Sequence, residues 1–458
     1  STHRGTLFPY TTLFRSTFTL MRSSNRSKNY SLIALAILGG SLLSSPEVSA
    51  QTAIGLRLGQ PEEVTLGVDG RITLDVAAFS PVNKSNFSYA NSTSASGGSV
   101  EPFRMAGGTS ITQARLGVFS SYGKWSGRVD VNYVGQRVTF CDIYAAYAFN
   151  PRTRLVLGHQ LEPMSIGMNT STRHGSVTTP LPLDFLIPYT RHWGLAGTHW
   201  GDKYWLGAGI FGGSSERVQA RENHLGEGYG VSMRAVYRPI NTAEHTLHIG
   251  LSAVARTPER VTSDEGIVSL GGHSGSAVEN RAFVAGRFSG IDHYTIGGLE
   301  AAYRNDHFFV QVEALRSTFV SKIAGAGLSN GNHSLIIGGD RATSFWGAYG
   351  FATYMLRGKQ RSYSNGSAVF SNVHDEVEPG GNLELLAGGS VLDAEPLLGQ
   401  GYELVGALNW YPNTAMMLGL SYTFTGLSDE ATALGRLRSK SGEGLSYSTL
   451  QLRAQFVF

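Results

Sequence analysis

From residue 64 onward, apolar and polar residues alternate in short segments, and this period of two constrains the fold most strongly. Successive side chains of a β-strand point to opposite faces, so the pattern predicts strands with one apolar and one polar face. Such segments recur along the chain, for example at 71–76, 128–133, 247–254, 416–424 and 450–458. A soluble β-sandwich also alternates, so the connections between the segments must distinguish the two folds.

Short turns and long loops follow one another in strict rotation. The short turns fall at 122–124, 150–152, 201–202, 239–244, 305–306 and 412–413. The long loops fall at 81–108, 161–190, 213–227, 257–293, 318–343 and 426–445. This asymmetry is typical of an outer-membrane β-barrel, which has short periplasmic turns and long extracellular loops. We count sixteen strands, an even number that places both ends at the periplasm, and the segment 357–381 is then a long periplasmic connection.

The composition favours membrane-spanning strands over membrane helices. Glycine contributes 58 of 458 residues and charged residues only 16%, whereas a spanning helix needs about 20 consecutive apolar residues. Aromatic residues cluster beside the short turns, at Tyr122, Trp125, Tyr147, Phe149, Trp200, Tyr204, Tyr237, Tyr303, Trp410 and Tyr411. Amphipathic rings prefer the headgroup level, so we interpret them as a periplasmic girdle. Scattered surface aromatics of a soluble protein are the alternative.

The first fifty residues are predicted to be targeting sequence and not part of the fold. Residues 1–20 precede Met21 and resemble translated sequencing-adapter sequence. Residues 21–50 have the basic, apolar and small-residue regions of a signal peptide, with cleavage expected before Gln51. A retained membrane anchor is the alternative. We expect a short periplasmic segment at 51–63 and the barrel at 64–458.

Charge and reactive residues exclude several function classes. From Gln51 onward the chain carries 32 Lys and Arg against 33 Asp and Glu, so no basic excess suggests nucleic acid. Cys141 is the single cysteine, which excludes an intramolecular disulfide. His245 and His248 would lie on opposite faces of a strand. We find no catalytic motif and expect no metal, no cofactor and no enzyme activity, although a barrel enzyme with Ser, His and an acid on one face is an alternative.

If the apolar faces contact lipid, several arginines line the interior. They are Arg71, Arg115, Arg128, Arg234, Arg256 and Arg453. Of the 32 basic residues after Gln51, 26 are arginine, whose planar donors suit oxyanions. Such a column would attract small anions. Carboxylates share the interior, so pairing of Arg with Asp or Glu across strands is an equal alternative.

Several stretches, in sequence order, resemble the phosphate-selective porin O and P family. They are DIYAAYAFNPRTRLVLGHQLEP at 142–163, GYGVSMRAVYRPI at 228–240, YMLRGKQRSY at 354–363, FSNV at 370–373, LNWYPN at 408–413 and LQLRAQFVF at 450–458. The resemblance implies a homotrimer of sixteen-stranded barrels in the outer membrane of a Gram-negative bacterium. It also implies anion preference, a third loop that folds inward and an extended connection at 357–381. The terminal Phe458 resembles the signal read by the barrel-assembly machinery.

The third loop departs from the family pattern. The family carries phosphate-binding lysines there, whereas 161–190 contains no Lys and Leu161 stands where the family has one. Its cations are Arg173 and His174, with Arg191 just after the loop. We therefore predict a porin for passive diffusion of small solutes, preferring anions such as phosphate, with Arg173 and Arg191 nearest the constriction. A non-conducting barrel with an adhesive or structural role is the alternative.

Overall fold

A computed structural model describes most of the unit Val48–Phe458. The described residues are 52–56, 64–81, 87–90, 100–102, 105, 107–172, 179–188, 190–214, 226–260, 266–272, 275–276, 278–279, 284–321, 327–329, 334–336, 341–371, 373, 376–395, 397–434, 437–439 and 444–458. The predicted leader and signal peptide, and the loop residues Arg173 and His174, lie outside them.

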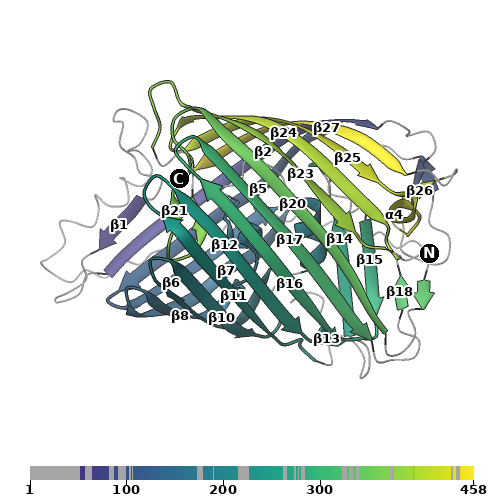
Figure 1. Cartoon of the computed structure of the whole chain (residues 1–458), viewed down its shortest axis with the longest axis horizontal. Helices are drawn as coiled ribbons and strands as arrows, with labels where there is room; N and C mark the ends of the chain where they lie inside the picture. Colours follow the sequence, from purple (N-terminus) through teal and green to yellow (C-terminus); the bar gives the residue numbers. More distant parts are fainter. Residues whose placement is uncertain are drawn as a thin grey trace, which may run out of the picture. The chain divides into compact units, whose positions relative to one another are not determined.

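Sixteen long strands form the wall of a barrel, as the sequence predicts (Figure 1). They are β2 (Val64–Pro81), β5 (Gly108–Tyr122), β6 (Trp125–Val134), β7 (Arg137–Asn150), β8 (Thr153–Leu161), β9 (Arg191–Trp200), β10 (Tyr204–Phe211), β11 (Gly230–Asn241), β12 (Thr246–Arg256), β16 (Ile291–Arg304), β17 (Phe308–Ser321), β20 (Arg341–Arg357), β23 (Asn382–Asp393), β24 (Gln400–Asn413), β25 (Met416–Leu427) and β27 (Leu445–Val457). Each of these strands pairs antiparallel with its neighbours along the chain.

The last strand closes the barrel on the first. Strand β27 pairs with β2 from Arg71 opposite Val457 to Pro81 opposite Tyr447. The backbone of Phe458 then exchanges two hydrogen bonds with Gly70, of 2.9 and 3.1 Å. Below this seam a seventeenth strand, β1 (Thr52–Leu56), pairs with Val64–Val68 of β2, within the stretch expected to be a short N-terminal segment. Closure leaves no open edge in the spanning part of the sheet, which a lipid environment requires.

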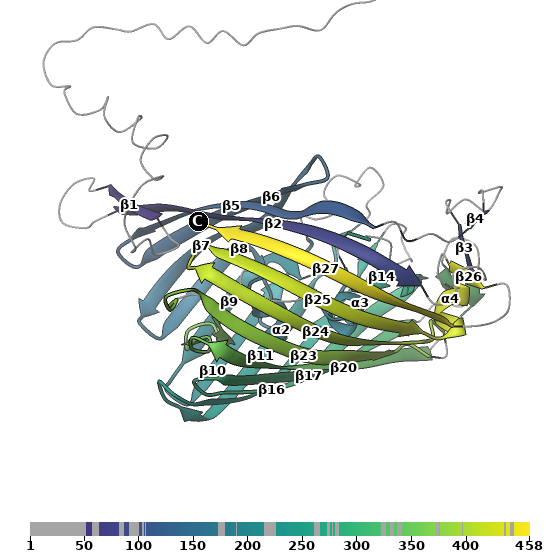
Figure 2. The ribbon, with the colours of Figure 1, turned by 90° about the horizontal axis from the view of Figure 1, so that it is seen from above.

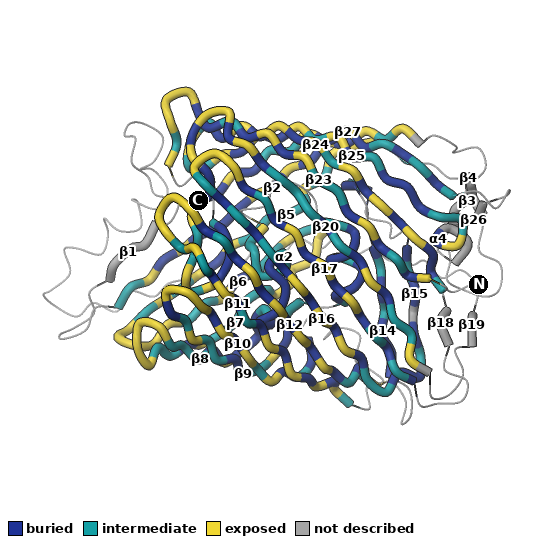
Figure 3. Tube along the Cα trace, in the orientation of Figure 1, coloured by how far each residue is buried: buried dark blue, intermediate teal, exposed yellow. Residues whose placement is uncertain are grey.

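On most strands of the wall the two faces differ as the alternation predicts (Figure 3). On β2, Ile72, Leu74 and Val76 point outward and are 42–48% exposed, whereas Thr73 and Asp75 point inward and are buried. The same division holds for Leu251 and Leu420, which are exposed on the outer face. The outer face of the barrel is therefore apolar, whereas many of its inward residues are polar or charged.

The connections separate into two rims. The turn rim carries 123–124, 151–152, 201–203, 242–245, 305–307, 358–381 and 414–415, and the loop rim carries 82–107, 135–136, 162–190, 212–229, 257–290, 322–340, 394–399 and 428–444. The expected strict rotation of short and long connections is wrong at 135–136 and 394–399, which are short although they lie at the loop rim. At the first of these, Gly135 and Gln136 both have positive φ, so a two-residue type I′ turn joins β6 to β7.

Small strands and helices occupy several connections. The loop rim carries β3 (Phe87–Ala90), β4 (Val100–Pro102), α2 (Ile166–Asn169), α3 (Leu181–Leu186), β13 (Glu259–Arg260), β14 (Gly266–Gly272), β15 (Val284–Ser289), β18 (Gly327–Ser329), β19 (Ser334–Ile336), α4 (Asp429–Leu434) and β26 (Leu437–Ser439). The long connection at the turn rim, predicted at 357–381, holds the hairpin of β21 (Tyr363–Ser364) and β22 (Val369–Phe370). No helix among the described residues is long and apolar enough to span a membrane.

Segments from both rims contact the inner face of the wall, and Figure 2 shows α2 and α3 enclosed by the strands. Helix α3 packs with β14, β15 and the inner side chains of β17 and β20, through Phe185, Phe288, Phe319 and Phe345. From the turn rim, Phe370 of the β21–β22 hairpin packs against Phe309 and against Ile166 of α2. Apolar clusters therefore fill part of the interior, and the open space lies elsewhere.

Candidate permeation cavity

A cavity of about 700 Å3 lies against the inner face of β2, β5, β6 and β7. Its other side is formed by residues 167–172 of the β8–β9 connection, which include most of α2 and the three residues after it. Four arginines and three aspartates line it, namely Arg71, Arg115, Arg128, Arg191, Asp69, Asp130 and Asp142. The structure thus brings together four of the seven arginines predicted from the sequence. Inward-pointing positions of neighbouring strands place these side chains on one surface.

Six of these charged side chains form one alternating chain across five strands, in the order Asp69, Arg128, Asp130, Arg115, Asp142 and Arg191. Arg128 bonds Asp69 through its Nη2 atom at 2.7 Å and Asp130 through its Nε atom at 2.8 Å. Arg115 Nη2 bonds Asp130 at 2.6 Å and Asp142 at 2.8 Å. Every charge therefore has a partner of opposite sign, as the pairing alternative predicted.

The last pair of this ion-pair network joins the start of β9 to β7. Arg191 Nε bonds Asp142 Oδ1 at 2.9 Å. The fourth arginine, Arg71, donates from Nε to Gln113 at 2.7 Å and from Nη1 to Ser171 at 3.1 Å. Arg71 therefore joins the wall to the segment after α2 through neutral acceptors.

The arginines and aspartates of this row of ion pairs are not all equally exposed to the cavity. The side chain of Arg128 is 25% exposed, whereas its partners Asp69 and Asp130 are 8% and 2% exposed. Arg115 is 15% exposed, against 2% for Asp130 and 16% for Asp142, and Arg191 equals Asp142 at 16%. Around Asp69 and Asp130 a solute in the cavity thus meets guanidinium groups more than carboxylate oxygens, whereas at Asp142 the two are equally exposed.

The opposite side of the cavity is neutral where the structure describes it. Residues 167–172 offer amide and hydroxyl groups, including Asn169, Thr170 and Ser171. Thr172 donates to Gln113 of the wall at 3.0 Å. Both signs of charge therefore lie on the same wall, and the described part of this segment does not supply an opposing row of charge.

Backbone N–H groups of the β8–β9 connection bond inward carboxylates of distant strands. Ile166 N donates to Glu300 at 2.7 Å and Gly167 N to Glu313 at 3.2 Å. Leu181 N donates to Glu403 at 3.0 Å. An unpaired buried N–H or carboxylate costs free energy, so these bonds hold the connection against β16, β17 and β24. The sequence places Glu300 and Glu313 at inward positions, but does not show that a loop backbone would be their partner.

Arg234 and Arg256 are placed differently from the cavity arginines. The Arg234 side chain is fully buried and bonds Glu300 at 2.7 Å and the carbonyl of Ala368 at 2.8 Å. Arg256 is 4% exposed and pairs with Glu162. Burial alone would raise the pKa of Glu162, but hydrogen bonding from His192 and the charge of Arg256 outweigh it and lower that pKa. Both arginines anchor segments that enter the interior.

The hairpin at the turn rim is anchored by residues that the sequence did not single out. Trp205 donates from its indole nitrogen to the carbonyl of Gly366 at 2.9 Å. Arg238 donates to the side chain of Asn365 at 2.9 Å and lies 5.4 Å from the ring centre of Tyr363. Burial raises the pKa of Tyr363 to about 12 despite the nearby charges of Arg238 and Arg234. The length of 357–381 was the available signal that this connection has a role of its own.

Solved structures with a similar fold are bacterial outer-membrane channels and proteins. The chain aligns with an anion-selective porin from Comamonas acidovorans at 12% identity and a TM-score of 0.50, covering 86% of this chain and 100% of that one. It aligns with OmpF of Salmonella typhi at 10% identity and a TM-score of 0.41, covering 86% and 98%. No curated protein matches the sequence.

The family comparison agrees with the fold. The model of the family "Phosphate-selective porin O and P" matches residues 105–458, which include fifteen of the sixteen wall strands and most of the cavity lining. The similarity inferred from short stretches of sequence is thereby confirmed. The chain belongs to the phosphate-selective porin O and P family, and it is an outer-membrane porin of a Gram-negative bacterium.

Proposed function

We propose that this porin conducts small anions more readily than small cations through the cavity beside β2, β5, β6 and β7. The observation that carries this proposal is that Arg128 is more exposed than Asp69 and Asp130, and Arg115 more exposed than Asp130, whereas Arg115 and its second partner Asp142 are equally exposed. Fixed guanidinium groups at a narrow aqueous passage lower the energy of an entering anion. The solved anion-selective porin of similar fold is consistent with this preference.

The third loop forms the narrowest part of the passage in this proposal. Its described residues 167–172 face the charged wall, and its bonds to Glu300, Glu313 and Glu403 fix it in place. Arg191 lies at its far end beside Asp142. Arg173, the other predicted cation of this loop, is assigned to the constriction by its position in the sequence alone.

Phosphate is expected to be a permeant anion without a tight site. A tight site needs several converging donors that are not committed elsewhere. Here Arg115, Arg128 and Arg191 already bond aspartates, and 161–190 has no Lys. We therefore expect phosphate to compete only modestly with chloride.

The decisive measurement is the reversal potential of the purified protein in planar bilayers under a potassium chloride gradient. We expect open channels with a chloride preference. Replacing Arg115→Gln and Arg128→Gln together leaves Asp69 and Asp130 with fewer cationic partners and should shift the preference several-fold toward potassium. Arg152→Gln is a matched control, because Arg152 pairs with Asp202 at the turn rim, away from the cavity.

Three outcomes of these conductance measurements would change the proposed function. Cation preference in the unmodified protein would overturn the anion proposal and leave the porin intact. The absence of any conductance would favour the non-conducting adhesive or structural alternative. Block of the chloride current by micromolar phosphate would show that the cavity arginines replace the missing lysines.

Two partner assignments complete the proposal. Family membership supports a homotrimer, which cross-linking of intact outer membranes would test by the mass of the product. Phe458 is 40% exposed and ends the closing strand, which suits recognition by the barrel-assembly machinery. Phe458→Ala should slow assembly without changing the conductance of those barrels that form.

A further inference from the structure

An arginine on the outer, lipid-facing side of the barrel has no partner in the described structure. Arg316 of β17 is exposed, and its neighbours Leu315 and Ser317 point inward and are buried. No hydrogen bond or ion pair joins Arg316 to any residue that the structure describes. A charged side chain on the lipid face is costly unless its charge is matched.

Arg316 stands near the membrane boundary of the loop rim. It follows Phe308, the first residue of β17 at the turn rim, by eight residues. At about 3.3 Å per residue and a strand tilt near 40°, this places it roughly 20 Å higher, against an apolar band about 25 Å tall. The loop rim is the extracellular rim, because outer-membrane barrels have short turns at the periplasm. Arg316 thus lies about 5 Å below the extracellular edge of the apolar band, close enough for its long side chain to reach the headgroups of the outer leaflet.

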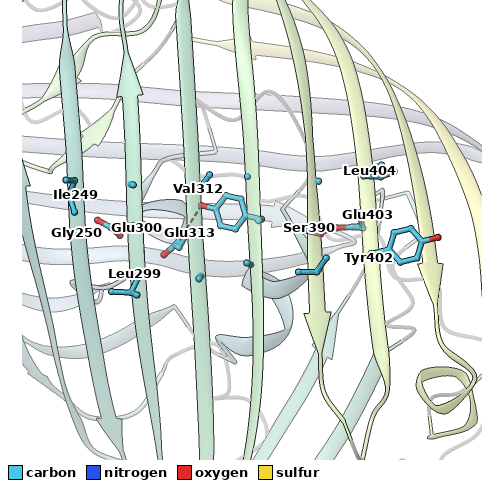
Figure 4. A pocket seen from close by; sticks show the side chains of 17 residues that line it. Ile249, Gly250, Leu299, Glu300, Val312, Glu313, Ser390, Tyr402, Glu403 and Leu404 are labelled. Atoms are coloured by element: carbon cyan, nitrogen blue, oxygen red, sulfur yellow. Dashed lines mark hydrogen bonds between the residues drawn. The ribbon is translucent and has the colours of Figure 1, made fainter.

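Below Arg316 the outer face carries an apolar groove of about 820 Å3 across β12, β16, β17, β20, β23 and β24. In the sheet register Arg316 lies opposite Trp346, Ala314 opposite Ala348, and Val312 opposite Gly350, so the groove begins one row below the arginine. Small outward residues form its floor, at Ala301, Ala314, Ala348, Gly350 and Gly389. Figure 4 shows larger side chains around it, including Leu299, Val312, Tyr402 and Leu404.

Space is also open beside the arginine itself. Its other cross-strand neighbour is Gly297 of β16, where an added Cβ would meet no atom within 4 Å. Trp346 on the other side is 49% exposed. A cation within reach of the headgroups, with room beside it and an apolar groove below, matches an amphiphile that has an anionic head and acyl chains.

We propose that this face binds a phosphate-bearing lipid of the outer leaflet, with a phosphate at Arg316 and an acyl chain in the groove. The charge favours such a lipid over a neutral one, because a phosphate oxygen would satisfy a guanidinium that is otherwise exposed to hydrocarbon and headgroups. The same charge disfavours a second copy of this face as the occupant, because the copy would have to offer an acid to Arg316. The acid nearest to Arg316 in the sheet register is Asp393, which already accepts hydrogen bonds from Gln400 at 3.3 Å and from the backbone of Glu395 at 3.1 Å.

Native mass spectrometry of the full-length protein, titrated with diphosphorylated lipid A, tests the proposal. We expect one or more retained lipid A molecules per barrel and at least tenfold weaker binding by Arg316→Gln. Arg316→Lys, which keeps the charge, should retain most of the binding. Ala314→Leu, which fills the groove below the arginine, should weaken binding several-fold.

The matched controls separate this site from general effects. Gly406→Leu adds a side chain at an outward position of β24 where a Cβ would meet nothing, and should bind lipid A as the unmodified protein does. Single-channel conductance should be unchanged in all four variants, because none alters the interior. Heat-modified migration on gels confirms that each barrel is folded.

Three results would overturn the proposal. The first is equal binding by Arg316→Gln and the unmodified protein, and the second is equal binding of lipid A from which both phosphates were removed. The third is a change in oligomeric state caused by Arg316→Gln or Ala314→Leu with lipid A binding unaffected, which would assign this face to a second copy of the chain. None of these results bears on ion selectivity, so the lipid site and the anion proposal are tested independently.

Discussion

Two sides of the barrel interior use the same kind of residue for different purposes. On the side of β2, β5, β6 and β7, Arg115 and Arg128 are 15% and 25% exposed to an open cavity. On the side of β11 and β12, Arg234 is fully buried and Arg256 is 4% exposed, and both hold inserted segments. All four are inward residues of antiparallel strands. An inward arginine is thus available to a solute only where no segment covers it.

The largest expected effect comes from removing the β21–β22 hairpin that covers Arg234. Replacing 362–371 by a short Gly-Ser link would delete β21 and β22 and expose the side of the interior around Arg234. Single-channel conductance should then rise several-fold, because the space beside β10 to β17 becomes part of the passage. An unchanged conductance would mean that the hairpin does not restrict ion flow. It would contradict the distinction between an open side and a covered side of the interior.

A second test compares stability on the two sides. Arg234→Met leaves Glu300 buried and deprives it of its cation, which should destabilise the barrel by roughly 3–5 kcal/mol. Arg128→Met should cost clearly less, since cavity water can solvate Asp69 and Arg115 still pairs with Asp130. Urea unfolding in lipid vesicles measures both. Equal losses would show that the cavity pairs are as structural as the buried ones.

A third test compares the inside with the outside of the wall. Leu251→Arg and Leu420→Arg place a charge on the lipid face and should cost roughly 2–4 kcal/mol if these positions lie near the membrane midplane. Ser421→Arg, at a neighbouring inward position that is only partly buried, should have little effect on folding. Similar destabilisation at Leu420 and Ser421 would contradict the assignment of the two faces.

The smallest expected effect concerns salt. The chloride preference should weaken as potassium chloride rises from 0.1 to 1 M, because the screening length falls from about 10 to about 3 Å. The loss should be larger for the unmodified protein than for the Arg115→Gln and Arg128→Gln double variant, which has less preference to lose. A salt-independent preference would point to direct anion contacts in place of the field of the exposed guanidinium groups.

Much of the architecture could be predicted from the sequence, and particular residues show why. Ile72, Leu74 and Val76 face outward and Thr73 and Asp75 inward because strand geometry fixes the direction of each side chain locally. The expected rotation of connections failed at Gly135 and Gln136, where a two-residue turn replaces a long loop. Turn chemistry acts over two residues, and the wider pattern of loop lengths did not reveal it.

The sequence by itself determined the strand count, the two faces of the wall and the set of inward arginines. Only the tertiary structure decided which of those arginines meet open space. Arg234 binds the carbonyl of Ala368, 134 positions away in the chain, and Ile166 N binds Glu300 at the same separation. A period of two is a local property of each strand, whereas the filling of the interior depends on contacts between distant segments that no local pattern specifies.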